Sequence, residues 1–220
     1  LYLSANGVTP VGLEAIREFY EARQNEQGDD EAKGSQLETL FLGCNRIGNE
    51  GAKIVADCLR CDRRLVRLSL ASSRIGAEGM RHLSAALAQH ARLQVLDLGY
   101  MRATMDLGEL GNFVEDEGAL CLSEYLKSTS SLLSLSVTHN HITQRGMRAL
   151  VQAVVGENRS LVSLDYVQYG VSLNEITLNE LRQALERNRE ELKRTRPDFD
   201  VQSVLVPDHV REIYSVYRTH

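Results

Sequence analysis

The stretch LETLFLGCNRIGNEG, residues 37–51, has leucines at positions 37, 40 and 42, followed by Asn45, Ile47 and Gly51. The leucines are three and then two residues apart, a spacing that neither a lone helix nor a lone strand favours. The same spacing returns 28 residues later in LVRLSLASSRIGAEG, residues 65–79. It returns again in LQVLDLGYMRA from Leu93, LLSLSVTHNHITQRG from Leu132 and LVSLDYVQYGV from Leu161. This recurrence predicts a protein built from stacked repeats.

The units begin 28, 28, 39 and 29 residues apart, and LYLSANGV at the start of the chain aligns with residues 40–47. One unit cannot bury its apolar face alone, so we expect the units to stack around one continuous core. We predict a repeat domain over residues 1–190, with about six units of which the first is truncated. An edge strand and a short helix are expected to cap it over residues 191–220. The uncapped first unit predicts further repeats, or another domain, before Leu1.

Each unit is expected to contain a short strand, a turn and a helix. In residues 37–42, Leu40 and Leu42 point inward, whereas Thr39 and Phe41 point outward. Asn45 is an inward polar residue in the turn, so its side chain must bond backbone groups that would otherwise be buried without partners. Asn6 and Asn140 align with Asn45, and Ser73, Met101 and Tyr169 stand at the same place in the other units.

The pattern L-x-x-L-x-L-x-x-N resembles the leucine-rich repeat signature. Repeats of 28–29 residues with a glycine and a helix after the motif resemble the ribonuclease-inhibitor-like subfamily. That group includes ribonuclease inhibitors, Ran GTPase-activating proteins and the repeat domains of NOD-like receptors. The resemblance implies an α/β leucine-rich repeat solenoid, a horseshoe with a parallel β-sheet on the concave face and helices on the convex face. It covers roughly residues 1–190.

Composition narrows the functional classes. The net charge of −5 argues against nucleic-acid or anionic-membrane partners, and no apolar run is long enough to span a bilayer. Four cysteines are too few for a disulfide scaffold of 220 residues, which predicts a reducing compartment such as the cytoplasm.

Motifs for catalysis or cofactor binding are missing from the sequence. There is no P-loop, nucleophile elbow, H-E-x-x-H or EF-hand loop. Cys58 and Cys61 form a C-x-x-C at the end of an expected helix, where the thiols are not activated. His139 and His141 supply at most half of a metal site. We therefore predict a chain with no enzymatic activity, cofactor, metal or small-molecule substrate, which binds another protein.

Three groups of residues are candidates for contacting that partner. Outward strand positions and adjoining loops contribute Phe41, Arg67, Asp97, Tyr100, His139 and Asp165. The loop edge contributes a basic column of Arg46, Arg74, Arg102 and His141. An eleven-residue insertion between Leu93 and Leu132 contributes Leu110 and Phe113. Two questions stay open. The basic column either pairs with recurring glutamates of the repeat itself or meets an acidic partner or a phosphate. Residues 104–115 either protrude as a binding lip or fold back on the loop edge.

An interaction module using the concave face and loop edge is the preferred function. The resemblance also implies two alternatives. One is a GTPase-activating protein of the Ran type. The other is the ligand-sensing repeat domain of a NOD-like receptor, with nucleic acid among the possible ligands. Receptors of that class often alternate two repeat types, whereas the units of this sequence look uniform.

Overall fold

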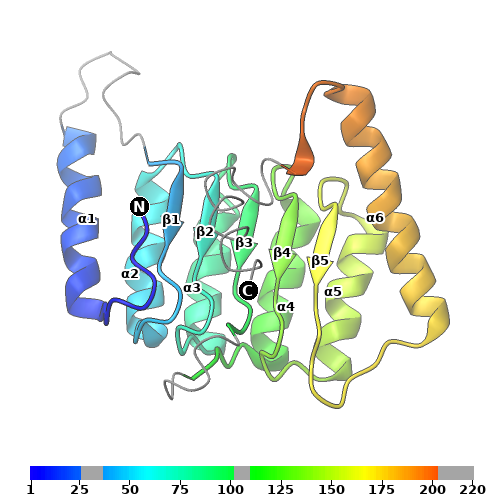
Figure 1. The fold of residues 1–220 in the computed structure, drawn as a ribbon, viewed down its shortest axis with the longest axis horizontal. Coiled ribbons are helices and arrows are strands. Elements are labelled where there is room, and N and C mark those ends of the chain that lie inside the picture. Colours follow the sequence, from blue (N-terminus) through cyan, green and yellow to red (C-terminus); the bar gives the residue numbers. More distant parts are fainter. Residues whose placement is uncertain (26–36, 102–109, 203–220) are drawn as a thin grey trace, which may run out of the picture.

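The computed structural model of the chain describes residues 1–25, 37–101 and 110–202. Five parallel strands form one sheet in chain order: β1 (Thr39–Phe41), β2 (Arg67–Ser69), β3 (Val95–Asp97), β4 (Ser134–Ser136) and β5 (Ser163–Asp165). Six helices are interleaved with them: α1 (Pro10–Asn25), α2 (Gly48–Cys61), α3 (Ala77–Leu87), α4 (Glu115–Ser128), α5 (Gln144–Gly156) and α6 (Glu175–Thr195). Helices α2–α5 form a layer behind the sheet (Figure 1). This arrangement confirms the predicted α/β solenoid, with the sheet on the concave face.

The core lies between the two layers. The middle residues of the strands are in register and buried: Leu40, Leu68, Leu96, Leu135 and Leu164. They belong to a single apolar cluster that runs from α1 to α6. The leucines just after β1, β2 and β3, at 42, 70 and 98, join the same cluster. The inward and outward positions predicted from the strand period are therefore confirmed.

The predicted role of Asn45 is also confirmed. Its Oδ1 accepts hydrogen bonds from Asn6 N (3.1 Å) and Val8 N (2.9 Å). Its Nδ2 donates to Leu3 O (2.8 Å) and Leu42 O (2.7 Å). One side chain thus satisfies buried backbone groups of its own unit and of the preceding unit, and ties the two together.

In the long unit that begins at Leu93, the inward polar residue that bonds buried backbone groups is Asn112 and not Met101. Asn112 Nδ2 and Oδ1 bond four buried backbone groups: Leu70 O (2.9 Å), Leu98 O (2.8 Å), Ser73 N (2.9 Å) and Ile75 N (3.0 Å). The extra eleven residues therefore precede the inward polar position, whereas the sequence alignment placed them after it. Gln168 likewise replaces Tyr169, because its amide bonds Val137 O and Asn140 N.

This shift of register corrects two site predictions. Counted from Asn112, the place assigned to Arg102 in the basic column belongs to Phe113, while Arg102 lies outside the described residues. Val114 is buried against the core. Residues 112–115, at the end of the insertion, therefore belong to the fold and not to a protruding lip. Residues 104–109 lie outside the described part of the chain.

The units are not uniform, because two conformations of the turn alternate. Helices α2 and α4 begin three residues after Asn45 and Asn112, with positive φ at Gly48 (62°) and Glu115 (56°). Helices α3 and α5 begin four residues after the equivalent Ser73 and Asn140. In these two units the positive φ falls instead at Arg74 (62°) and His141 (59°). The local sequence alone did not reveal this alternation.

A side chain near the start of α2 caps the start of α3, and one near the start of α4 caps the start of α5 in the same way. Asn49 Oδ1 accepts from Gly76 N and Gly79 N at the start of α3. Asp116 Oδ1 accepts from Thr143 N (2.8 Å) and Gly146 N (3.1 Å) at the start of α5. Free N–H groups at helix starts are satisfied in this way across the repeat boundary. The units are therefore joined in pairs, α2 with α3 and α4 with α5.

Gly146 is required by this close approach. A Cβ at Gly146 would lie 2.6 Å from Asp116 Oδ1 and 3.0 Å from Ala119 Cβ, whereas a Cβ at Gly12 would meet only Val8 Cγ1 at 3.5 Å. We expect Gly146→Ala to lower the free energy of unfolding by about 1–3 kcal/mol through overpacking. Gly12→Ala, its matched control, should be neutral or stabilise α1 by up to about 1 kcal/mol. Chemical denaturation measures both, and equal effects would contradict the predicted role of the glycine.

The C-terminal cap predicted for residues 191–220 is described only in part. Helix α6 ends at Thr195 and crosses the predicted boundary at residue 190. Residues 201–202 are helical, and no strand forms within the described residues 199–202. Phe199 and Val201 pack against Leu133 and Val162 in a small apolar cluster. Residues 203–220, which include the expected final helix, lie outside the described part of the chain.

Candidate functional site

The exposed face of the sheet presents two columns of side chains in register. The first contains Phe41, Ser69, Asp97, Ser136 and Asp165, and the second contains Thr39, Arg67, Val95, Ser134 and Ser163. Tyr2 extends the first column, since its ring packs edge-on against Phe41 at 4.9 Å. Four candidate residues, Phe41, Arg67, Asp97 and Asp165, thus lie on one rigid surface.

The part of this surface over β3–β5 is acidic. Asp97 accepts hydrogen bonds from Ser69 Oγ (2.9 Å) and Gly99 N (2.9 Å). Burial raises the pKa of Asp97 above its ordinary value, the charge of Asp165 raises it further, and these hydrogen bonds offset part of the effect. Arg67, on β2, supplies the basic side chain of the same face and reaches Thr39 Oγ1 at 3.4 Å.

An aromatic rim borders the sheet where β3, β4 and β5 end. We define it as Tyr100, Phe113, His139, His141 and Tyr169. His139 stacks on Tyr169 with ring centroids 4.3 Å apart, and Tyr100 meets His139 edge-on at 6.0 Å. Phe113 stacks on His141 at 5.1 Å. The rim therefore joins side chains from three successive loops.

A hollow of about 400 Å³ opens within this rim. Tyr100, His139, His141 and Tyr169 contribute to its wall, together with Gln168 and the start of α5. Gln168, which lines this hollow, is held in place because its amide bonds the backbone of the preceding turn. A hollow with rigid aromatic walls and a few polar groups is suited to hold a side chain of a partner.

The structure brings together most, but not all, of the predicted site residues. Tyr100, Phe113, His139 and His141 meet in the rim. Arg46 and Arg74 lie on the same loop edge in the earlier units. Leu110 is 50% exposed at the end of the insertion. Tyr169 was missed, because the alignment placed it at the inward polar position, and the signal that could have identified it is Gln168, a side chain able to take the role of asparagine.

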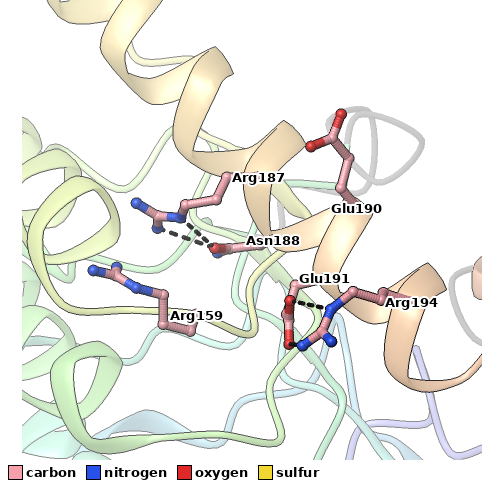
Figure 2. A pocket seen from close by; sticks show the side chains of 6 residues that line it. All are labelled: Arg159, Arg187, Asn188, Glu190, Glu191 and Arg194. Carbon is pink, nitrogen blue, oxygen red and sulfur yellow. Dashed lines mark hydrogen bonds and ion pairs between the residues drawn. The ribbon is translucent and has the colours of Figure 1, made fainter.

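A second hollow, of about 490 Å³, lies between α6 and the end of α5 (Figure 2). Arg187 donates to Val155 O (3.2 Å) and Asn158 O (2.8 Å), and Arg159 donates to Gly156 O (2.8 Å). Both guanidinium groups thus cap the carbonyl end of α5, where cations are favourable. This hollow is a seam that docks α6, and the guanidinium groups of Arg159 and Arg187 are already engaged with the fold.

The four cysteines, Cys44, Cys58, Cys61 and Cys121, are free in the structure. Burial, together with the smaller effect of the neighbouring Cys61, raises the pKa of Cys58 to about 12. We expect alkylation without reductant to label four thiols in the unfolded chain, with Cys58 unreactive in the native state, because the thiolate is the nucleophile. Mass spectrometry measures both states. A mass that shows a disulfide, or rapid native labelling of Cys58, would contradict this prediction.

None of the helices within the described residues has the length and apolarity needed to cross a membrane.

Parts of the chain are similar to known proteins. The family model described as "Leucine Rich repeat" matches residues 36–56 and 129–151. Over 141 residues the chain is 34% identical to "NACHT, LRR and PYD domains-containing protein 14" of Mus musculus, covering 63% of this chain and 13% of the relative. Over 130 residues it is 29% identical to "NACHT, LRR and PYD domains-containing protein 13" of Homo sapiens, covering 59% and 11%. The chain therefore corresponds to a small part of these relatives.

Solved structures resemble the chain in fold. One is the actin-binding site 2 of leiomodin-1, with a TM-score of 0.63 and 18% identity over 81% of this chain and 92% of the other. Another is the tropomodulin C-terminal domain of Caenorhabditis elegans, with a TM-score of 0.63 and 18% identity over 85% and 99%. At this identity the likeness concerns the backbone architecture alone.

Proposed function

This chain is a leucine-rich repeat protein, and we propose that it binds a protein partner through the concave sheet face and the aromatic rim, without catalysing a reaction. The observation that carries the proposal is the arrangement of outward side chains from five in-register strands next to a hollow with aromatic walls. A solenoid holds such an array rigid, so little conformational entropy is lost on binding.

The comparisons support a protein-interaction module in general. The relatives carry leucine-rich repeats beside other domains, and a structural neighbour bears the name of an actin-binding site. The choice of the concave face and rim is our proposal. It rests on the exposed side chains of Asp165 and Tyr169 and on the half-buried side chain of Asp97.

A second proposal is that the chain is the repeat portion of a NACHT-containing receptor of the ribonuclease-inhibitor-like subfamily, with a cytoplasmic location. The alternation of two turn conformations favours it, because that class often alternates two repeat types. The two mammalian relatives support the same assignment. In that case the partner, or an agonist, would be sensed by the surface described above.

Matched variants test the proposed binding face. Phe41→Ala and Asp165→Ala alter the concave face, and Glu180→Ala and Arg182→Ala alter exposed positions on α6. Each variant is immobilised and used to capture proteins from a cell lysate, and the captured proteins are quantified by mass spectrometry. The same proteins should be lost with both concave variants and kept with both α6 variants. A purified protein from that set should then bind the parent chain directly.

Two results would contradict the proposal. One is capture that depends on α6 and not on the sheet. The other is acceleration of GTP hydrolysis by a small GTPase in the presence of the chain, which would indicate a GTPase-activating protein of the Ran type.

A further inference from the structure

The hollow in the aromatic rim is lined in part by aromatic rings. Tyr169 is 79% exposed and stacks on His139, and Tyr100 closes the arrangement edge-on. Ring faces are electron-rich, so a cation placed over them is attracted by the ring quadrupole. Aromatic walls that converge from three loops are therefore suited to a flat cationic group as well as to an apolar one.

The neighbouring charges decide between these possibilities. The outward positions of β3–β5 are Val95, Asp97, Ser134, Ser136, Ser163 and Asp165, two carboxylates with no basic side chain among them. Asp165 is exposed, at the end of the strand that leads into the loop of Tyr169. The two carboxylates already repel each other, since the charge of Asp165 raises the pKa of Asp97. A cation bound here would relieve that repulsion.

The surface between the carboxylates and the rim is polar. At Gly99 a Cβ would lie 2.5 Å from Ser136 Oγ and 2.6 Å from Thr138 Oγ1, so the missing side chain leaves room for these hydroxyls. Thr138 Oγ1 in turn accepts from Tyr100 N at 3.1 Å. Hydroxyl and carboxylate oxygens thus lead from the sheet face to the ring faces, and all of them can accept hydrogen bonds from a donor-rich group.

Resting on the proposed function, we infer that this site receives an arginine side chain of the partner, with the guanidinium against the exposed ring of Tyr169 and hydrogen-bonded to Asp165. A guanidinium is planar, stacks on aromatic faces and carries five donors, whereas a lysine ammonium is a strongly hydrated point charge. A neutral aromatic anchor would use the ring walls but would leave the negative charge of the carboxylates uncompensated. Charge complementarity therefore selects arginine.

The experiment uses the whole chain and capped Gly-Gly-X-Gly-Gly peptides with X as Arg, Lys, Phe or Glu. Two-dimensional NMR follows the tyrosine and histidine ring signals as each peptide is added. We expect saturable shifts with Arg, weaker shifts with Lys and none with Glu. Tyr169→Ala should weaken Arg binding about threefold or more, the scale of an exposed cation–π contact, whereas Tyr169→Phe should keep it.

Charge is tested separately from ring stacking. Asp165→Asn should weaken binding of the Arg peptide about threefold or more, while Glu180→Gln on α6 serves as the matched loss of one exposed carboxylate and should change nothing. Binding of the Phe peptide as tightly as the Arg peptide, or indifference to Asp165→Asn, would overturn the inference in favour of a neutral anchor.

The two proposals fail in different ways. If the captured partner depends on the concave face while the Arg peptide does not bind, the inference fails and the proposed binding face stands. If the Arg peptide binds at Tyr169 while capture ignores every concave variant, the proposed binding face fails and the chemistry of the hollow stands.

Discussion

Asn112→Ala is expected to lower the free energy of unfolding by about 3–6 kcal/mol. The side chain is 1% exposed and bonds four backbone groups, two carbonyls and two N–H groups. A buried backbone group without a partner costs about 1–3 kcal/mol, and the sum is reduced because water entering the gap satisfies some of these groups. Chemical denaturation of the variant measures the loss.

Two companion variants make this prediction specific. Asn179→Ala changes an exposed asparagine on α6 and should cost under about 0.5 kcal/mol. Adding Met101→Asn to the Asn112→Ala variant should not restore stability, because residue 101 does not hold the inward position. Recovery by the added asparagine, or a loss below about 1 kcal/mol for Asn112→Ala, would show that the register described above is wrong.

The periodic part of the fold was predictable from the sequence because period and burial have the same cause. Leucines three and two residues apart fix a strand that turns out of the sheet, and repetition of the unit fixes the stack. The inward role of Asn45 followed from the cost of burying backbone groups without partners, and the same argument applies to Asn140. Each of these conclusions needed one unit and its period.

The insertion was misplaced because its position depends on contacts between units. Leu98 O and Ser73 N are bonded by the inward amide of the following unit, and the leucine spacing does not say whether residue 101 or residue 112 supplies it. Chemical type was the better guide, since an amide can both donate and accept whereas a thioether cannot. The same reasoning assigns the inward polar position of the last unit to Gln168 and not to Tyr169, which leaves Tyr169 as a residue of the rim.

The candidate site was predictable only in part for a related reason. The sheet columns follow from strand alternation, so Phe41, Asp97 and Asp165 could be placed in advance. The rim gathers side chains from loops of different length, and its stacking pairs, such as His139 with Tyr169, depend on the corrected register. Alternation of the turns was hidden as well, because it is set by capping contacts such as that of Asp116 with the next helix.

Leu68→Ala is expected to lower the free energy of unfolding by about 2–5 kcal/mol, the range for a large-to-small change in a packed core. Leu68 is 0% exposed in β2 and lies in register between Leu40 and Leu96, so the cavity would open where collapse is hindered on both sides. Arg74→Ala, on the loop edge, should cost under about 1 kcal/mol. Denaturant titration of both variants gives the comparison. Equal losses would mean that the loop edge supports the fold as strongly as the core, and the edge could then no longer be treated as a surface available for a partner.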